Sequence, residues 1–179
     1  MSQFEFVFVL FSIVAGFALT HLFGGLARTF QMQGRSLDAA HFLASLSAIF
    51  ALIVDWWAMY RYIDAEWTFA KFGIHVLLFA TLYGVAVTLF PPGRTDIPSF
   101  AEVRVTAFGF FTALIIVETA HDAAMGGLFE PWYLLLIQVG LVIAFAMGIA
   151  LRTVRTDITV CSLALSSVVF WGVVPRFVV

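Results

Sequence analysis

Charged residues are scarce in this chain, and their scarcity excludes several classes of protein. Only 11% of the 179 residues are charged, whereas 63% are hydrophobic and 17% are aromatic. Soluble domains use roughly 25% charged residues, so this chain has too few polar groups to cover its surface in water. Nine Lys and Arg residues against eleven Asp and Glu residues also leave no basic surface for nucleic acid. We therefore expect lipid to be the main solvent of the chain and the bilayer its main partner.

Motifs that mark common enzyme chemistries are also missing. The sequence has no glycine-rich phosphate loop ending in Lys, no Gly-x-Ser-x-Gly elbow and no His-Glu-x-x-His pair. The single cysteine, Cys161, permits no internal disulfide. The single lysine, Lys71, lies at the predicted start of a helix, which disfavours a retinal protein. These absences disfavour an enzymatic function but do not exclude one.

Long hydrophobic runs are the main feature that is present. A spanning helix needs about 20 mainly apolar residues, because each residue rises 1.5 Å through a core roughly 30 Å thick. Six runs meet this requirement, and they do not alternate between apolar and polar residues as barrel strands would. The predicted fold is an all-α, polytopic membrane bundle that forms one domain. Its six helices are expected at residues 4–27, 37–63, 68–90, 100–121, 132–151 and 158–174.

Basic residues are distributed unevenly between the two ends of this predicted bundle. Basic loops tend to stay on the cytoplasmic side of a membrane. The first, third and fifth connections hold Arg28, Arg35, Arg94, Arg104, Arg152 and Arg155, whereas the other side holds Arg61, Lys71 and Arg176. This difference predicts that both termini are non-cytoplasmic.

One stretch of the first two helices resembles a known group of proteins. The run Phe-Ser-Ile-Val-Ala-Gly at 11–16, with Thr-His-Leu at 20–22 and Asp-Trp-Trp at 55–57, is similar to small polytopic bacterial membrane proteins. The resemblance covers only these two helices and implies no activity. It agrees with a location in a bacterial cytoplasmic membrane.

Small residues recur at intervals of four along three of the predicted helices. Lipid gives helices little hydrophobic drive to associate, so close approach through small residues supplies dispersion contacts. The glycines concerned are Gly16, Gly24, Gly84, Gly140 and Gly148. Packing within the chain is the first interpretation. A contact in a homo-oligomer or a larger membrane complex is the alternative, and the stripe from Gly140 to Gly148 is the surface such a partner would use.

Ionisable residues inside the predicted spans are the best candidates for a functional site. A titratable group at membrane depth costs a few kcal/mol on insertion scales, so it usually faces the bundle interior. Asp55, His75, Glu118 and His121 have similar predicted depths on the second, third and fourth helices. Carboxylates can replace part of the hydration shell of an ion, and a neutral imidazole can pass protons because its unperturbed pKa is about 6.5. These residues predict the passage or sensing of a proton or small cation.

Three other interpretations remain for the same residues. Two histidines on neighbouring helices can ligate one haem iron, so His21 with His41, and His75 with His121, could hold two b-type haems that carry electrons. Glu118 and His121 stand three residues apart on one helical face, so with Asp55 or His75 they could bind a divalent metal. The polar groups could also simply join helices by hydrogen bonds in a non-catalytic subunit or sensor.

Overall fold

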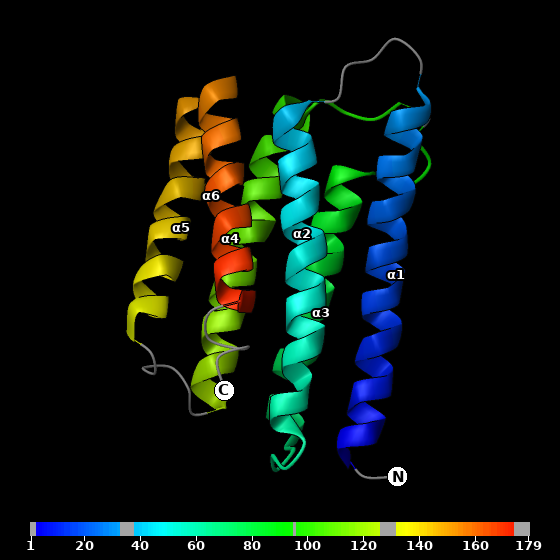
Figure 1. The fold of residues 1–179 in the computed structure, drawn as a ribbon, viewed down its shortest axis with the longest axis vertical. Coiled ribbons are helices and arrows are strands. Elements are labelled where there is room, and N and C mark those ends of the chain that lie inside the picture. The colour runs from blue at the N-terminus through cyan, green and yellow to red at the C-terminus, as the bar shows by residue number, and fades with distance from the viewer. Residues whose placement is uncertain (1–2, 33–37, 95, 126–131, 174–179) are drawn as a thin grey trace.

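The computed structural model describes residues 3–32, 38–94, 96–125 and 132–173, and these residues form a helical bundle with its connections (Figure 1). All six α-helices are long and apolar enough to span a bilayer, which confirms the predicted all-α polytopic fold. The elements are α1 (Gln3–Gln31), α2 (Ala39–Ala58), the 3-10 helix η1 (Met59–Tyr62), α3 (Phe69–Leu89), α4 (Phe100–Ala124), α5 (Trp132–Leu151) and α6 (Val154–Val173).

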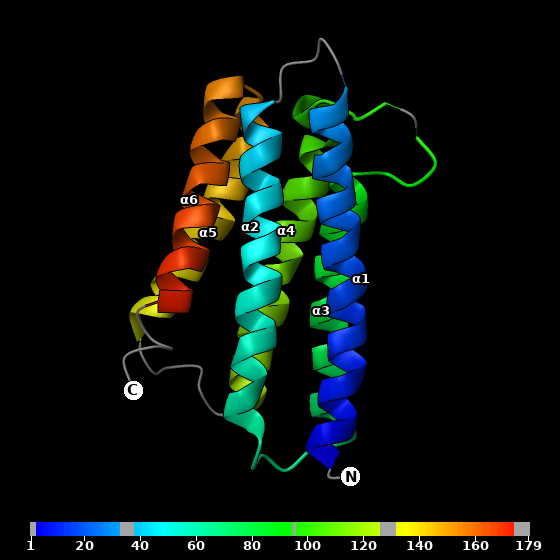
Figure 2. The same ribbon diagram turned by 45° about the vertical axis from the view of Figure 1, so that its right-hand side comes forward.

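The six helices form two layers of three. Helices α1, α2 and α6 lie in one layer, and α3, α4 and α5 lie in the other, as both ribbon views show (Figures 1 and 2). Contacts connect α1 to α3, α2 to α3 and α5 to α6 across the layers, and α2 to α6 and α3 to α4 within them. Helices α2 and α4 are therefore the central elements, and buried polar side chains gather on both of them.

Helix boundaries differ from the prediction where local capping extends a helix. Helix α6 begins at Val154 instead of residue 158, because the Thr153 hydroxyl accepts a hydrogen bond from the Thr156 amide at 3.1 Å. Helix α5 ends at Leu151, and Arg152 follows with a φ of 51°, a left-handed conformation that ends a helix. Residues 37 and 174, predicted as helix ends, lie outside the described residues, as do Arg35 and Arg176.

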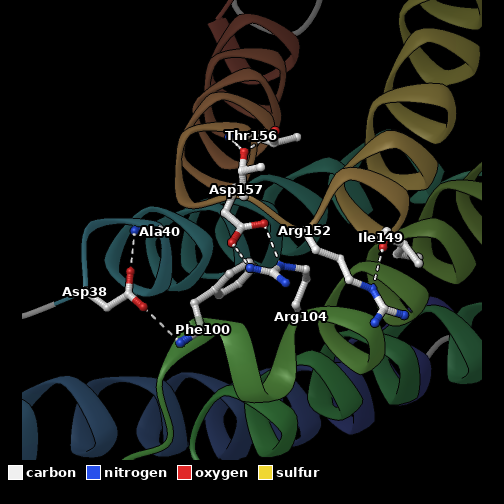
Figure 3. A network of polar contacts seen from close by, with 9 residues as sticks. Asp38, Ala40, Phe100, Arg104, Ile149, Arg152, Thr156 and Asp157 are labelled. Carbon is white, nitrogen blue, oxygen red and sulfur yellow. Dashed lines mark hydrogen bonds and ion pairs between the residues drawn. The ribbon is translucent and has the colours of Figure 1, made fainter.

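A buried ion pair joins α4 to α6 near the start of both helices. Arg104 donates from Nε to Asp157 Oδ1 at 2.8 Å and from Nη2 to Asp157 Oδ2 at 2.6 Å (Figure 3). The two side chains are only 9% and 3% exposed. A two-point guanidinium–carboxylate contact fixes the orientation as well as the distance of its partners. The pair therefore sets how α6 lies against α4.

The carboxylate of Asp38 caps two helices at once. Its Oδ1 accepts from the amide of Ala40 at 3.0 Å, and its Oδ2 accepts from the amide of Phe100 at 2.9 Å (Figure 3). The first amides of a helix have no partner within the helix, and the helix dipole favours a negative charge there. Asp38 therefore holds the starts of α2 and α4 together at the same end of the bundle as the ion pair.

The predicted glycine contacts are only partly present within the chain. A Cβ at Gly84 would lie 2.4 Å from the Phe110 ring, and one at Gly148 would lie 2.4 Å from the Phe108 ring. At Gly16, Gly24 and Gly140 a Cβ would meet no atom of the described residues within 4 Å. Packing within the chain therefore finds no support at these three positions, because a spacing of four defines a helix face without saying what covers it. A contact with another copy or a partner stays a prediction.

Breaking the buried ion pair should destabilise the bundle. Arg104→Met leaves the Asp157 carboxylate buried without its cation, so we expect the free energy of unfolding to fall by about 3 kcal/mol. Denaturant titration in detergent micelles measures this change. Arg94→Met is the control, because the Arg94–Asp96 pair has exposed side chains and should contribute little. Arg104→Met combined with Asp157→Leu should recover much of the loss. Equal stability of the Arg104→Met variant and the unmodified protein would contradict the assignment.

Two glycines of α5 should respond differently to one added methyl group. Gly148→Ala places a Cβ against the Phe108 ring, so we expect it to lower the free energy of unfolding by about 1–3 kcal/mol. Gly140→Ala meets nothing within 4 Å and should leave the stability unchanged or raise it slightly. Thermal unfolding of the two variants at one protein concentration compares them. Equal effects would show that Gly148 is not a packing position.

Candidate functional site

Two histidines from neighbouring helices are in direct contact. His75 lies in α3 and His121 near the end of α4, and their Nε2 atoms are 3.0 Å apart. The ring centroids are 4.1 Å apart and the rings are nearly perpendicular, at 87°. Both residues are buried. A separation of 3.0 Å is the length of an ordinary hydrogen bond, so one Nε2 donates a proton and the other accepts it.

The backbone determines which ring donates when both rings are neutral. His75 Nδ1 lies 3.2 Å from the carbonyl oxygen of Lys71, and a carbonyl can only accept, so Nδ1 carries the proton. His75 Nε2 is then the acceptor, and His121 Nε2 is the donor. The remaining nitrogen, His121 Nδ1, lies 3.6 Å from Oδ1 of Asp122. The two rings thus form two successive hydrogen bonds, from His121 Nε2 to His75 Nε2 and from His75 Nδ1 to the Lys71 carbonyl at the start of α3, and Asp122 lies beside them.

Aromatic rings enclose this pair on several sides. Phe11 stacks on His75 with centroids 5.3 Å apart, and Trp67 meets the same ring at 4.9 Å. Tyr62 presents its ring edge-on to His75 at 5.7 Å and to His121 at 5.3 Å. Such an enclosure excludes bulk water, and the lower dielectric constant strengthens polar contacts inside it. The Asp122 side chain is 22% exposed, so the pair has a polar route towards the end of the bundle where α4 ends.

All four residues predicted to form the outer polar cluster line one small cavity. Asp55 of α2, Glu118 of α4 and the two histidines surround it, together with Tyr62 and Asp122. Its volume is about 10 Å³, close to the smallest space that holds one water molecule. The structure thus brings together side chains from three helices that the sequence placed at a common depth.

A second cavity lies on the other side of the two carboxylates. Asp55 and Glu118 line it too, and its volume is about 50 Å³. Gln138 of α5 also lines it and accepts a hydrogen bond from the Thr119 hydroxyl at 3.0 Å. Sequence reasoning missed Gln138, although it is a rare polar residue in a strongly apolar helix and is buried here. The carboxylates therefore stand between a small cavity beside the histidines and a larger one towards α5 and α6.

The other two histidines have different surroundings. His21 donates from Nε2 to the carbonyl oxygen of Phe90 at 2.6 Å. The His41 ring lies against the Phe90 ring with centroids 5.0 Å apart, and neither of its ring nitrogens has a hydrogen-bond partner within the described residues. Phe90 thus contacts both His21 and His41. No contact between the two histidines is present among the described residues.

This geometry offers little support for the haem and metal interpretations. A porphyrin would have to lie between the ring nitrogens of its two axial histidines, and the 3.0 Å separation of His75 and His121 leaves no space for it. Within the described ranges, no three His, Cys, Asp or Glu side chains are grouped so that they could hold a metal ion. The contact between the rings is instead suited to sharing a proton.

Comparison with known proteins adds no assignment to this site. No family model, no curated protein and no solved structure matches the chain.

The hydrogen-bond chain predicts different tautomers for the two rings. At alkaline pH, His75 should carry its proton on Nδ1 and His121 on Nε2. Solid-state nitrogen NMR on histidine-labelled protein in bilayers distinguishes protonated from bare ring nitrogens. A variant with His21→Gln and His41→Gln leaves only this pair to assign. Identical tautomers in the two rings would contradict the contact.

Proposed function

We propose that this protein passes or senses protons in a membrane through the His75–His121 pair and the carboxylates of Asp55 and Glu118. The observation that carries the proposal is the 3.0 Å contact between the two Nε2 atoms beside a cavity that the carboxylates share. A proton can pass along a hydrogen bond between two imidazoles, because each ring nitrogen can either bind or release a proton. We infer a role in binding or transport, without an enzymatic reaction.

The contact provides a relay whose protons can be followed atom by atom. A proton that arrives at Asp122 passes to His121 Nδ1, which makes that ring a cation. His121 then transfers its Nε2 proton to His75 Nε2 and becomes neutral again, with its proton on Nδ1. His75 now carries the charge beside the small cavity, and its Nε2 proton has to leave the contact with His121 before Asp55 or Glu118 can accept it through one bridging water. One positive charge has moved from the rim of the bundle to the carboxylates.

The size of the small cavity favours a proton over a metal cation. About 10 Å³ accommodates at most one water molecule and cannot hold a hydrated cation. The Phe11 and Trp67 rings beside His75 add no oxygen ligands to those of the groups that line the cavity. Among the cations that the sequence predicts, the proton is therefore the one that suits this site.

Beyond the carboxylates, aromatic side chains separate the larger cavity from the far end of the bundle. Phe111 and Phe145 line that cavity, and their ring centroids are 5.6 Å apart. Phe108 stacks on Phe145 on the side towards the Arg104–Asp157 pair, also at 5.6 Å. Apolar constrictions of this kind stop conduction by excluding water. Continuous passage would therefore require these rings to move, whereas sensing would require only the outer part.

We propose a bacterial cytoplasmic membrane as the location, with the starts of α2, α4 and α6 on the cytoplasmic side. The connection after α5 and the early residues of α4 and α6 carry Arg152, Arg104 and Arg155, and basic residues favour that side. The histidine pair would then receive protons from the non-cytoplasmic side.

Neutralising either carboxylate tests the proposal. Asp55→Asn and Glu118→Gln keep the side-chain shape but remove the proton acceptor, so we expect proton flux to fall by roughly a hundredfold, as when a positioned proton-transfer group is lost. Flux is measured with a pH-sensitive dye inside liposomes that contain the purified protein. Asp64→Asn is the control, because Asp64 is exposed and lies outside the cavity.

Three outcomes would overturn the assignment of proton passage. Flux through the unmodified protein could be no greater than through empty liposomes under a pH gradient of either direction. Flux could remain unchanged in both carboxylate variants. A gradient of Na⁺ or K⁺ at constant pH could drive cation flux as well as a proton gradient drives proton flux, which would show that the site selects a different ion.

A further inference from the structure

A groove runs along the outer face of the bundle between α1 and α3. Most of its lining comes from α1, and Tyr83 of α3 forms part of the opposite wall. Its volume is about 570 Å³, within the range of about 300–1,000 Å³ that is common for sites of small molecules. Helices α1 and α3 lie on the opposite side of the bundle from α5 and α6 (Figure 2), and the groove shares no lining residue with the second cavity. The groove is therefore distinct from the candidate proton site.

The polarity of the groove changes in order along the helix axis. Val14 and Phe17 provide apolar surface, Thr20 and Tyr83 bring hydroxyl groups to the middle, and Arg28 stands in the last turn of α1. Fourteen residues separate Val14 from Arg28, which corresponds to about 21 Å along the helix. A phospholipid in a bilayer has chemical groups in the same order, from the apolar acyl chain through the ester groups to the charged phosphate.

Three polar side chains of this groove, those of Arg28, Thr20 and Tyr83, have hydrogen-bonding capacity to spare within the described part of the chain. Arg28 donates from Nη1 to the carbonyl oxygen of Arg94 at 3.4 Å, and no described acidic side chain pairs with it. Arg94, by contrast, forms an ion pair with Asp96 at 2.9 Å. In the same described residues, the hydroxyls of Thr20 and Tyr83 have no hydrogen bond. A guanidinium with donors to spare at the end of an apolar groove complements an anion with an apolar tail.

The wall of the groove is fixed in place by Phe90, the residue that follows α3. His21 lines the groove and is held by its hydrogen bond to the Phe90 carbonyl. Gly25 rests so closely on the Phe90 ring that an added Cβ would lie 2.1 Å from it. Gly24, the neighbouring residue, faces open space. The groove is thus a built feature of the α1–α3 contact, and the missing side chain at Gly24 keeps it open.

We propose that this groove binds one anionic phospholipid, with an acyl chain along Val14 and Phe17 and the phosphate at Arg28. The hydroxyls of Thr20 and Tyr83 then meet the ester oxygens, and the guanidinium donates to two phosphate oxygens. Basic pockets between spanning helices are a known kind of site for anionic headgroups. This binding does not depend on the proton relay.

Native mass spectrometry of the detergent-purified protein tests the site. Titration with dioleoylphosphatidylglycerol should give one tightly bound lipid, and dioleoylphosphatidylcholine should bind about fivefold more weakly, as expected for one basic contact. Arg28→Gln should remove this preference by weakening only the phosphatidylglycerol complex, again by about fivefold. Gly24→Leu should weaken both lipids, because the new side chain fills the groove.

Gly16→Leu is the matched control for the filled groove. Gly16 also lies on α1 with nothing within 4 Å of an added Cβ, but it does not line the groove. The Gly16→Leu substitution should leave lipid binding unchanged. Thermal unfolding should show that Gly16→Leu and Gly24→Leu both keep the stability of the unmodified protein. Equal binding of the two lipids to the unmodified protein would overturn the proposal. So would unchanged binding in Gly24→Leu, or full displacement of the lipid by millimolar inorganic phosphate, which would point to a free anion instead.

Discussion

A bilayer offers no hydrogen bonds to the side chains that it surrounds, and the polar contacts of this protein follow from that constraint. Each ionisable group in a span has to find a partner within the chain or stay near the membrane surface. Arg104 of α4 and Asp157 of α6 neutralise each other's charge in a buried ion pair. Asp38 satisfies the first amides of α2 and α4. Each partnership also specifies the relative position of helices whose apolar surfaces alone would slide past one another.

The histidine pair satisfies the same constraint without a permanent charge. A guanidinium and a carboxylate keep their charges, so their contact is a fixed joint. Two imidazoles can hydrogen-bond as neutral rings and can also hold an added proton between them. The described structure therefore places its fixed ion pair at one end of α4 and its exchangeable contact at the other. The aromatic rings of Phe108, Phe111 and Phe145 separate the two regions.

The sequence predicted the architecture well because the thickness of a bilayer sets the length of each apolar run. The convergence of Asp55 and Glu118 with His121 was also predictable, because polar residues in a span tend to face inward and helical spacing gives their depth. The contact of His75 with His121 was not predictable in this detail. It depends on the rotation of α3 against α4, which packing decides. Helical spacing likewise could not show that Gly24 faces a groove whereas Gly148 lies under a ring.

The double cap at Asp38 links the order of assembly to the order of the chain. Its contact with Ala40 is local and can form as soon as the first turn of α2 exists. Its contact with Phe100 spans 62 residues, so the start of α4 acquires its negative cap only when α4 arrives beside α2. During synthesis, the first half of the protein would thus present a carboxylate that awaits a later helix. The helix dipole then favours an α4 that brings its amino end to that carboxylate over one that brings its carboxyl end.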